Sequence, residues 1–370
     1  MEKEQGASKE AASTKEIYKV GITLGDLNGI GPEVAIKALK DNRILADFTP
    51  VIYGSSKVLS HYKKLLELQD FQYTTCKDAS EVLTKKINVI NVWNEEVELQ
   101  VGESTATGGS YAFKSLEAAT QDLSEGKIDV LVTSPFSKDA IQKAGFQFPG
   151  HTEYLADMSG VKEALMILVS PSLKVALVTT HIPIKEVSSA LSKEGILSKI
   201  EKFEQSLKKD FGIVKPRIAV FGLNPHAGEN GKLGAEEQEI ISPAIQQAKG
   251  KGILAFGPFP ADGFFGSDMK NQFDGVLAMY HDQGLTAFKA LAFEDGVNFT
   301  ADLPIVRTSP DHGTAFDIAG KNLANEQSMR SAMYLAVEIL KNRKFTKLIH
   351  ANPLPFSKEE RGKKESDRPI

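Results

Sequence analysis

The chain has 370 residues, of which 41% are hydrophobic and 25% are charged, a composition typical of folded globular proteins. The formal net charge of -4 offers no general attraction to nucleic acid, and no apolar run approaches the ~20 residues of a membrane span. A single cysteine, Cys76, excludes an intrachain disulfide and a multi-cysteine zinc site. We therefore expect a cytoplasmic protein with no nucleic-acid or membrane partner.

Short β-branched segments alternate with longer amphipathic segments, which is the pattern of an α/β protein. The strands predicted in chain order are 18–23, 50–53, 87–92, 130–133, 164–169, 175–179, 217–221 and 275–279. The predicted helices are 32–39, 110–123, 236–249 and 328–340. Because the strands are apolar throughout, we expect a mainly parallel sheet with helices on both faces.

Both ends of the chain are rich in charged residues and poor in apolar ones. Such segments bury too little surface to offset the entropy lost on ordering. We expect a disordered extension at 1–16 and a disordered, charged tail at 354–370.

Four histidines follow strand-like runs, the position where ligands gather in open α/β sheets: His151, His181, His226 and His281. Without a cysteine partner, the last three would suit a divalent ion such as Zn²⁺, with open positions for substrate oxygens. The nearby Asp262 and Asp282 are candidate supporting residues, further ligands or proton acceptors. In the alternative interpretation each histidine only makes hydrogen bonds within its loop.

Residues 25–33, GDLNGIGPE, form a glycine-rich segment between a predicted strand and a predicted helix. The position is that of a phosphate-binding loop, but the pattern is neither GxGxxG nor a P-loop. The alternative is structural, because Pro32 suits a helix start and the glycines permit a tight turn.

Residues 311–321, DHGTAFDIAGK, form a second glycine-containing segment. Its Gly-Thr-Ala turn would expose backbone N–H groups to a phosphate, while His312 and Phe316 could stack on an adenine. The alternative is a helix N-terminus with an ordinary cap.

Lys289, Asn298 and Arg307 are spaced through one polar region after His281. A phosphomonoester in a slightly acidic protein needs fixed donors of this kind. Alternatively, each is a solvated surface residue.

Six motifs, taken together, resemble the 4-hydroxythreonine-4-phosphate dehydrogenase family of pyridoxal phosphate (vitamin B6) biosynthesis. They are GDLNGIGPE (25–33), GHTE (150–153), TH (180–181), NPHAGE (224–229), YHDQG (280–284) and DHGTA (311–315). The resemblance runs from about Tyr18 to about Pro353. It implies an isocitrate/isopropylmalate dehydrogenase-like two-domain fold with mainly parallel sheets, not a Rossmann fold, and a homodimer with active sites at the subunit interface.

The resemblance also implies roles for individual residues of this chain. The metal ligands would be His181, His226 and His281, with one of them contributed by the neighbouring subunit. The substrate-binding residues would be His151, Thr152, Lys289, Asn298 and Arg307. The 311–321 segment is similar to the adenine-binding loop of β-decarboxylating dehydrogenases, so the cofactor-binding residues would be His312, Gly313, Thr314, Ala315 and Asp317. The proton acceptor stays open among Asp262, Asp282 and Lys289.

The length of the chain predicts two domains. We expect 17–125 plus 295–353 to form the first, with the nucleotide-binding loop. We expect 126–294 to form the second, with the metal and dimer contacts.

The activity implied by the resemblance is oxidation of 4-phosphohydroxy-L-threonine, with NAD or NADP and one divalent ion (Zn, Mg or Co) per site. The product, 2-amino-3-oxo-4-(phosphonooxy)butanoate, would decarboxylate to 3-amino-2-oxopropyl phosphate. One alternative is a paralogous dehydrogenase of 4-phospho-D-threonate or erythronate. From other classes, a non-catalytic phosphate-metabolite binding protein or a phosphate-acetyltransferase-like enzyme would not need three histidines.

Overall fold

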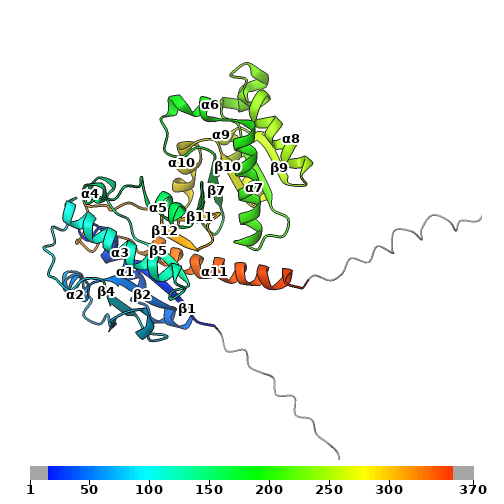
Figure 1. The fold of residues 1–370 in the computed structure, drawn as a ribbon. Coiled ribbons are helices and arrows are strands. Elements are labelled where there is room, and N and C mark those ends of the chain that lie inside the picture. Colours follow the sequence, from blue (N-terminus) through cyan, green and yellow to red (C-terminus); the bar gives the residue numbers. More distant parts are fainter. Residues whose placement is uncertain (1–15, 353–370) are drawn as a thin grey trace, which may run out of the picture.

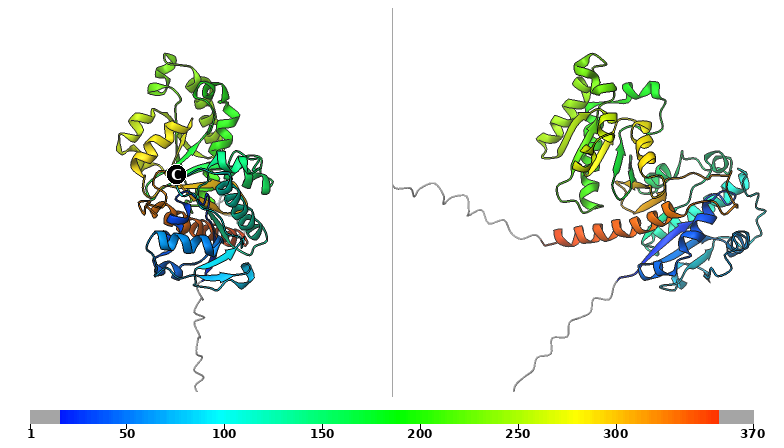
Figure 2. Two further views of the ribbon diagram at one scale, coloured as in Figure 1. Left: turned by 90° about the vertical axis from the view of Figure 1, so that its left-hand side faces the viewer. Right: turned by 180° about the vertical axis from the view of Figure 1, so that it is seen from behind.

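The structure, a computed structural model, describes residues 16–352. Two lobes are joined through a shared middle region (Figures 1 and 2). The strands are β1 (Tyr18–Thr23), β2 (Phe48–Gly54), β3 (Thr74–Cys76), β4 (Asn88–Asn91), β5 (Val130–Thr133), β6 (Leu165–Val169), β7 (Lys174–Leu177), β8 (Arg217–Phe221), β9 (Leu254–Phe259), β10 (Gly275–Ala278), β11 (Val297–Ala301) and β12 (Arg307–Pro310). The helices are α1 (Gly31–Leu39), α2 (Ser56–Leu65), α3 (Ala106–Ser124), α4 (Lys138–Lys143), α5 (His151–Met158), α6 (Val187–Ala190), α7 (Lys193–Lys209), α8 (Ser242–Gly250), α9 (Ala261–Phe265), α10 (His281–Leu291) and α11 (Gln327–His350).

One 12-stranded sheet runs through both lobes in the order β3-β4-β2-β1-β5-β12-β11-β6-β7-β10-β8-β9. Neighbouring strands are parallel except at β12–β11, β11–β6 and β6–β7. Because of these reversals, the parallel strands on the two sides of the middle run in opposite directions. A Rossmann sheet has a different strand order and no such reversal. The prediction of a mainly parallel α/β fold that is not a Rossmann fold is confirmed.

The eight predicted strands are all present, three of them with the predicted ends and the others with ends shifted by one or two residues. Strands β3, β9, β11 and β12 were not predicted from the sequence. The predicted helix 236–249 begins as a π-helical turn, η5 (Glu237–Ile241), before α8, and the predicted helix 328–340 continues to His350 as α11.

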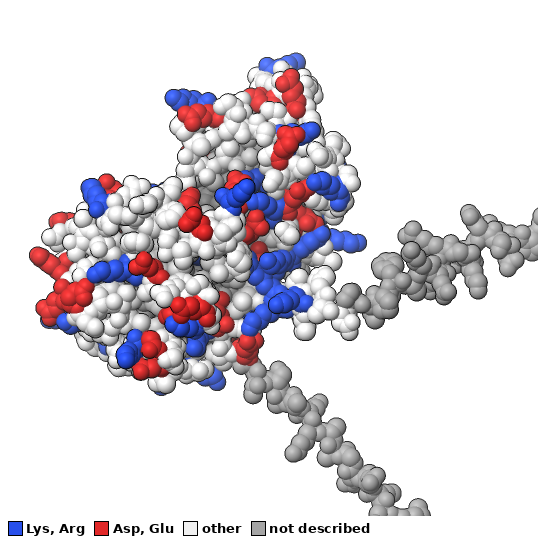
Figure 3. All heavy atoms as spheres, viewed as in Figure 1, with Lys and Arg blue, Asp and Glu red and all other residues white. Residues whose placement is uncertain are grey.

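The lobes are built on strands whose residues are buried on both faces. All seven residues of β2 are buried, as expected for a parallel strand covered by helices on both sides. A side-chain cap fixes where α3 begins: the Thr105 hydroxyl accepts a hydrogen bond from Gly108 N. Acidic and basic side chains both occur over the face shown in Figure 3, in keeping with the small net charge.

The predicted domain division stays a prediction. β5, from the predicted second domain, pairs with β1 and β12, and β11 pairs with β12 and β6, so the sheet is continuous across the expected boundary. The predicted disordered ends lie outside the described residues, apart from Glu16, whose carboxylate accepts a hydrogen bond from Tyr18 Oη at 2.8 Å.

None of the helices in the described part of the chain has the length and apolar character needed to cross a membrane. The predicted cytoplasmic location stays a prediction.

Candidate functional site

A cavity of about 470 Å³ lies over one face of the middle strands, between the two lobes. Ser309 on β12, Asn298 on β11 and Leu168 on β6 are aligned in register, so their side chains share this face. The predicted substrate residues His151, Thr152, Lys289, Asn298 and Arg307 all line the cavity. Segments nearly 160 residues apart in the chain therefore meet around one space.

Arg307 supplies a buried positive charge to the cavity. Its side chain donates hydrogen bonds to Thr133 Oγ1, at 3.0 Å from Nε and 2.6 Å from Nη2, and to Thr300 Oγ1 at 3.0 Å. Burial lowers the pKa of the guanidinium to about 10, so it stays charged at neutral pH. Among the described residues no carboxylate forms an ion pair with it, although a buried cation normally has a partner. The cavity is therefore suited to an anionic ligand.

Asn298 and Lys138 add a side-chain amide and an ammonium group to the cavity. The Asn298 Oδ1 atom is buried and makes no hydrogen bond with the described residues, which leaves the amide available to a ligand. Lys138, at the start of α4, lines the same cavity as Arg307 and Lys289 and adds a third basic side chain.

His151, the first residue of α5, stacks on Phe136 with ring centroids 3.9 Å apart. Burial places the pKa of this imidazole well below its usual value, and the neighbouring Arg307 and Lys138 charges act in the same direction. His151 is therefore neutral at pH 7 and can serve as a hydrogen-bond donor or acceptor in the cavity.

Lys289 on α10 is held by Asp311, which follows β12. Its ammonium donates a hydrogen bond to the Asp311 carbonyl oxygen at 2.9 Å and lies 3.1 Å from Asp311 Oδ2. Burial raises the pKa of the Asp311 carboxyl, and the Lys289 charge opposes this rise. Of the three predicted proton acceptors, only Lys289 lines this cavity.

His181 and His281 come together at one edge of the cavity, with ring centroids 5.8 Å apart. Zn–N bonds of about 2.0–2.1 Å would let two rings at this spacing bind one ion. Burial lowers the pKa of His181, which favours the neutral, ligating form. The His281 Nδ1 atom is 2.7 Å from Asp282 Oδ1, an arrangement that fixes the ring of a metal-binding histidine.

His226 does not line the cavity of its own chain. Among the described residues, no three or more His, Cys, Asp or Glu side chains are grouped closely enough to hold a metal ion. One chain therefore brings two of the three predicted ligands together. The expectation that the third comes from a neighbouring subunit stays a prediction.

The chain segments that carry the three histidines are nonetheless linked. They follow β7, β10 and β8, which are adjacent parallel strands, so the segments emerge at one edge of the sheet. Thr179 Oγ1 donates to Met279 O at 2.8 Å, and Gln283 Nε2 donates to Gly222 O at 2.6 Å. The Gln283 Oε1 atom also accepts from Met279 N at 2.7 Å.

The 311–321 segment forms turns rather than a helix N-terminus. Its first residues, His312 and Gly313, line the cavity, whereas Thr314, Ala315 and Asp317 do not. The His312 Nε2 atom is buried without a hydrogen-bond partner among the described residues, and burial lowers the pKa of the ring. The start of this segment is therefore open to a ligand, as a cofactor loop would be.

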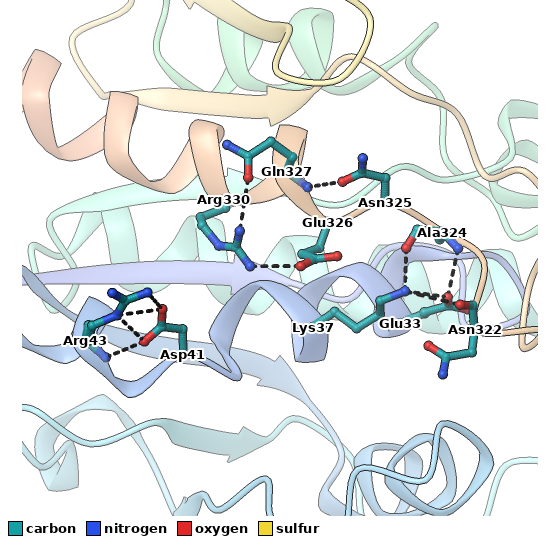
Figure 4. A network of polar contacts seen from close by, with 10 residues as sticks. All are labelled: Glu33, Lys37, Asp41, Arg43, Asn322, Ala324, Asn325, Glu326, Gln327 and Arg330. Atoms are coloured by element: carbon teal, nitrogen blue, oxygen red, sulfur yellow. Dashed lines mark hydrogen bonds and ion pairs between the residues drawn. The ribbon is translucent and has the colours of Figure 1, made fainter.

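The glycine-rich segment 25–33 is buried and supports the 311–321 loop. Ile30 N donates to Thr314 O at 2.9 Å, and a Cβ on Gly29 would lie 2.8 Å from the same oxygen. Glu33 Oε1 accepts from Ala324 N at 3.0 Å, and Lys37 Nζ donates to Ala324 O at 2.6 Å (Figure 4). These contacts therefore agree with the structural interpretation, in which the glycines permit a tight turn.

Other residues at the cavity escaped the sequence analysis. Thr133, Lys138 and Asp311 line it without having been assigned a role. The signals were the position of Thr133 at the end of a predicted strand and the position of Asp311 at the start of the DHGTA motif. Conversely, the candidate Asp262 is exposed on α9 and lies outside the cavity lining.

Comparison with known proteins gives consistent matches over most of the chain. The family model of the pyridoxal phosphate biosynthetic protein PdxA matches residues 46–336. A 4-hydroxythreonine-4-phosphate dehydrogenase of Bacteroides thetaiotaomicron is 50% identical over 337 residues, covering 91% of this chain and 92% of the relative. A D-threonate 4-phosphate dehydrogenase of Cupriavidus necator is 40% identical over 329 residues, covering 88% and 98%. Among solved structures, a 4-hydroxythreonine-4-phosphate dehydrogenase of Klebsiella pneumoniae has a TM-score of 0.75 and 38% identity, covering 89% of this chain and 99% of that one.

Proposed function

Because the chain belongs to the pyridoxal phosphate biosynthetic protein PdxA family, we propose that it oxidises 4-phosphohydroxy-L-threonine with a nicotinamide cofactor and a divalent metal ion. Relatives that are named dehydrogenases imply a nicotinamide cofactor, and NAD and NADP both remain compatible with the proposal. The observation that carries the proposal is the buried Arg307 guanidinium, which faces a cavity with two adjacent imidazoles and has no carboxylate partner among the described residues.

In the proposed complex, Arg307 binds the phosphate through charge-assisted hydrogen bonds. His151, Thr152 and Asn298 line the same cavity and orient the substrate beside this anchor. With the phosphate anchored, the substrate hydroxyl would lie toward the edge of the cavity that carries His181 and His281. Holding the hydroxyl in this position would lower the activation barrier of its oxidation.

His181, His281 and His226 of a second copy would hold the divalent ion, for which zinc, magnesium and cobalt are the candidates. Neutral imidazole at His181 and the Asp282 contact to His281 both suit a metal ligand. A bound cation would polarise the substrate hydroxyl, and the oxidised nicotinamide would accept the hydride.

The hydroxyl proton needs an acceptor, and we propose Lys289 from among the three candidates because it lines the cavity. Its neighbour Asp311 holds the amine through two contacts and so fixes its direction. His312 and Gly313, with Thr314, Ala315 and Asp317 behind them, would bind the cofactor.

The product is a β-keto acid, which loses its carboxylate readily because the adjacent carbonyl accepts the electrons. The outcome would be CO₂ and 3-amino-2-oxopropyl phosphate. In this proposal the enzyme is a homodimer, because one chain assembles only two of the three metal ligands.

A second candidate substrate is 4-phospho-D-threonate, because a relative named D-threonate 4-phosphate dehydrogenase covers most of the chain. That substrate keeps the phosphate but lacks the amino group. Cofactor reduction followed with each substrate separates the two, since a site built for one polar group rejects the analogue without it by up to ~10⁴-fold or more. A higher kcat/KM for the threonate would overturn our choice of substrate, and undiminished activity after chelation would overturn the metal requirement.

A further inference from the structure

The loop that carries His226 has an unusual backbone. Five consecutive residues, His226 to Asn230, have positive φ angles of 52°, 49°, 77°, 43° and 56°. Only the middle one, Gly228, is a glycine, the residue that adopts this left-handed conformation freely. Left-handed L-residues are disfavoured, and such strain persists only where the surroundings hold the backbone in place.

Glu237 makes three hydrogen bonds to the start of this loop, where Glu236 also accepts one from Asn224 Nδ2 at 2.8 Å. The Glu237 Oε1 atom accepts hydrogen bonds from Leu223 N at 2.7 Å and Asn224 N at 2.8 Å, and its Oε2 atom accepts from Asn224 Nδ2 at 3.0 Å. Glu237 is 3% exposed and opens the π-helical turn η5. No basic side chain forms an ion pair with it in the described part of the chain. Its carboxylate is therefore held by hydrogen bonds from Leu223 and Asn224.

The loop also closes around the carboxylate from both sides of His226. A Cβ on Gly228 would lie 2.4 Å from Glu237 Oε2, and a Cβ on Gly222 would lie 2.9 Å from Oε1. Both positions therefore need glycine for the loop to approach so closely. A connection between β8 and α8 would not require a buried carboxylate, a π-helical turn and a left-handed backbone together, and π-turns occur frequently at functional sites.

We propose that Glu237 is a positioning residue, which fixes the left-handed loop so that His226 projects as a ligand toward the metal of a second copy. This inference rests on the proposed function, in which His226 binds that metal. Glu237 itself touches neither substrate nor metal. Its effect passes through Asn224 and Gly228 to the backbone of His226.

The test compares Zn²⁺ affinity in Glu237→Gln and Glu239→Gln, measured on the full-length protein by competition with a chelating dye. Both variants lose one negative charge on η5, but Glu239 is exposed and makes no side-chain contact with the loop. We expect Glu237→Gln to weaken Zn²⁺ binding about 10- to 100-fold, the usual effect of removing a residue that orients a ligand, and Glu239→Gln to leave it unchanged. Wild-type affinity in Glu237→Gln would overturn the proposal.

A double-variant cycle separates positioning from a general structural effect. If Glu237 acts through His226, His226→Ala combined with Glu237→Gln binds Zn²⁺ no more weakly than His226→Ala alone. Additive losses would overturn the positioning role. Should Glu237→Gln fail to fold, Gly228→Ala probes the same contact from the loop side: weaker Zn²⁺ binding supports the proposal, and unchanged binding overturns it.

His226→Ala distinguishes this inference from the proposed function. If that variant binds Zn²⁺ like the wild type, the proposed metal site itself fails. If it binds weakly while Glu237→Gln binds normally, only the role of Glu237 fails.

Discussion

Arg307 on β12 donates two hydrogen bonds to a single oxygen on β5, the Thr133 hydroxyl, at 3.0 Å and 2.6 Å. The two parallel strands thus hold the guanidinium in a fixed direction at the floor of the cavity. Arg307→Ala should weaken binding of the phosphorylated substrate by ~1.5–3 kcal/mol, the contribution of hydrogen bonds to a charged group. Calorimetric titration measures this, with exposed Arg217→Ala as the control. Unchanged affinity in Arg307→Ala would contradict the phosphate assignment.

Thr133→Val keeps the shape of the side chain but removes the acceptor that orients Arg307. The guanidinium keeps its charge and its bond to Thr300, so the expected loss of substrate affinity is smaller, ~0.5–1.5 kcal/mol. The same titration checks it. Thr120→Val is the matched control, because that buried threonine donates to the Leu116 carbonyl within α3 and does not line the cavity. Equal effects in the two variants would argue against an orienting role for Thr133.

The depressed pKa of His151 predicts a pH dependence of stability. Unfolding exposes a histidine with a pKa near ~6.5, so below that pH the unfolded state binds a proton that the folded state does not. Stability should fall as the pH drops from ~6.5 toward the folded pKa, by at most ~1.4 kcal/mol per pH unit for this group. Urea unfolding at pH 7.5 and pH 5.0 measures the loss, which should be smaller in His151→Gln.

A control for that experiment is His61→Gln, which alters an exposed histidine of α2. It should lose as much stability on acidification as the wild type. The account of His151 fails if its glutamine variant does so too.

Asp282→Asn tests the contact that orients His281. The carboxylate is 2.7 Å from His281 Nδ1, and loss of such a partner commonly weakens metal binding about 10- to 100-fold. Zn²⁺ competition with a chelating dye gives the affinity, and exposed Asp70→Asn serves as the control. Tight Zn²⁺ binding in Asp282→Asn would show that the orientation of His281 does not depend on this carboxylate.

The sequence predicted the strands that are apolar along their length, because a run such as 130–133 reads as buried whatever surrounds it. It did not predict β12, whose residues Arg307 to Pro310 are mostly polar and include a proline. That strand is recognisable only through its neighbours, β5 and β11. The sequence consequently predicted individual residues of the cavity floor, but not that they lie together on one face of the sheet.

In the candidate site, too, some features could be predicted from the sequence and others could not. The positions of His181, His226 and His281 after strands could be predicted, but the adjacency of β7, β10 and β8 comes from the sheet order, which the sequence does not specify. The contact between Lys289 and Asp311 joins a helix to a turn through space, so no local pattern encodes it. Glu237 likewise belongs to no recognisable sequence motif, because its proposed role depends on how the loop that carries His226 folds.

Complementation between two inactive variants tests the shared metal site most directly. His226→Ala and His181→Ala should each lack activity as homodimers. After mixing and subunit exchange, about half of the dimers are hybrids and one site in each hybrid regains all three histidines, so we predict recovery of roughly a quarter of wild-type activity. No recovery, with hybrid dimers verified by native mass spectrometry, would contradict a site completed by a second copy.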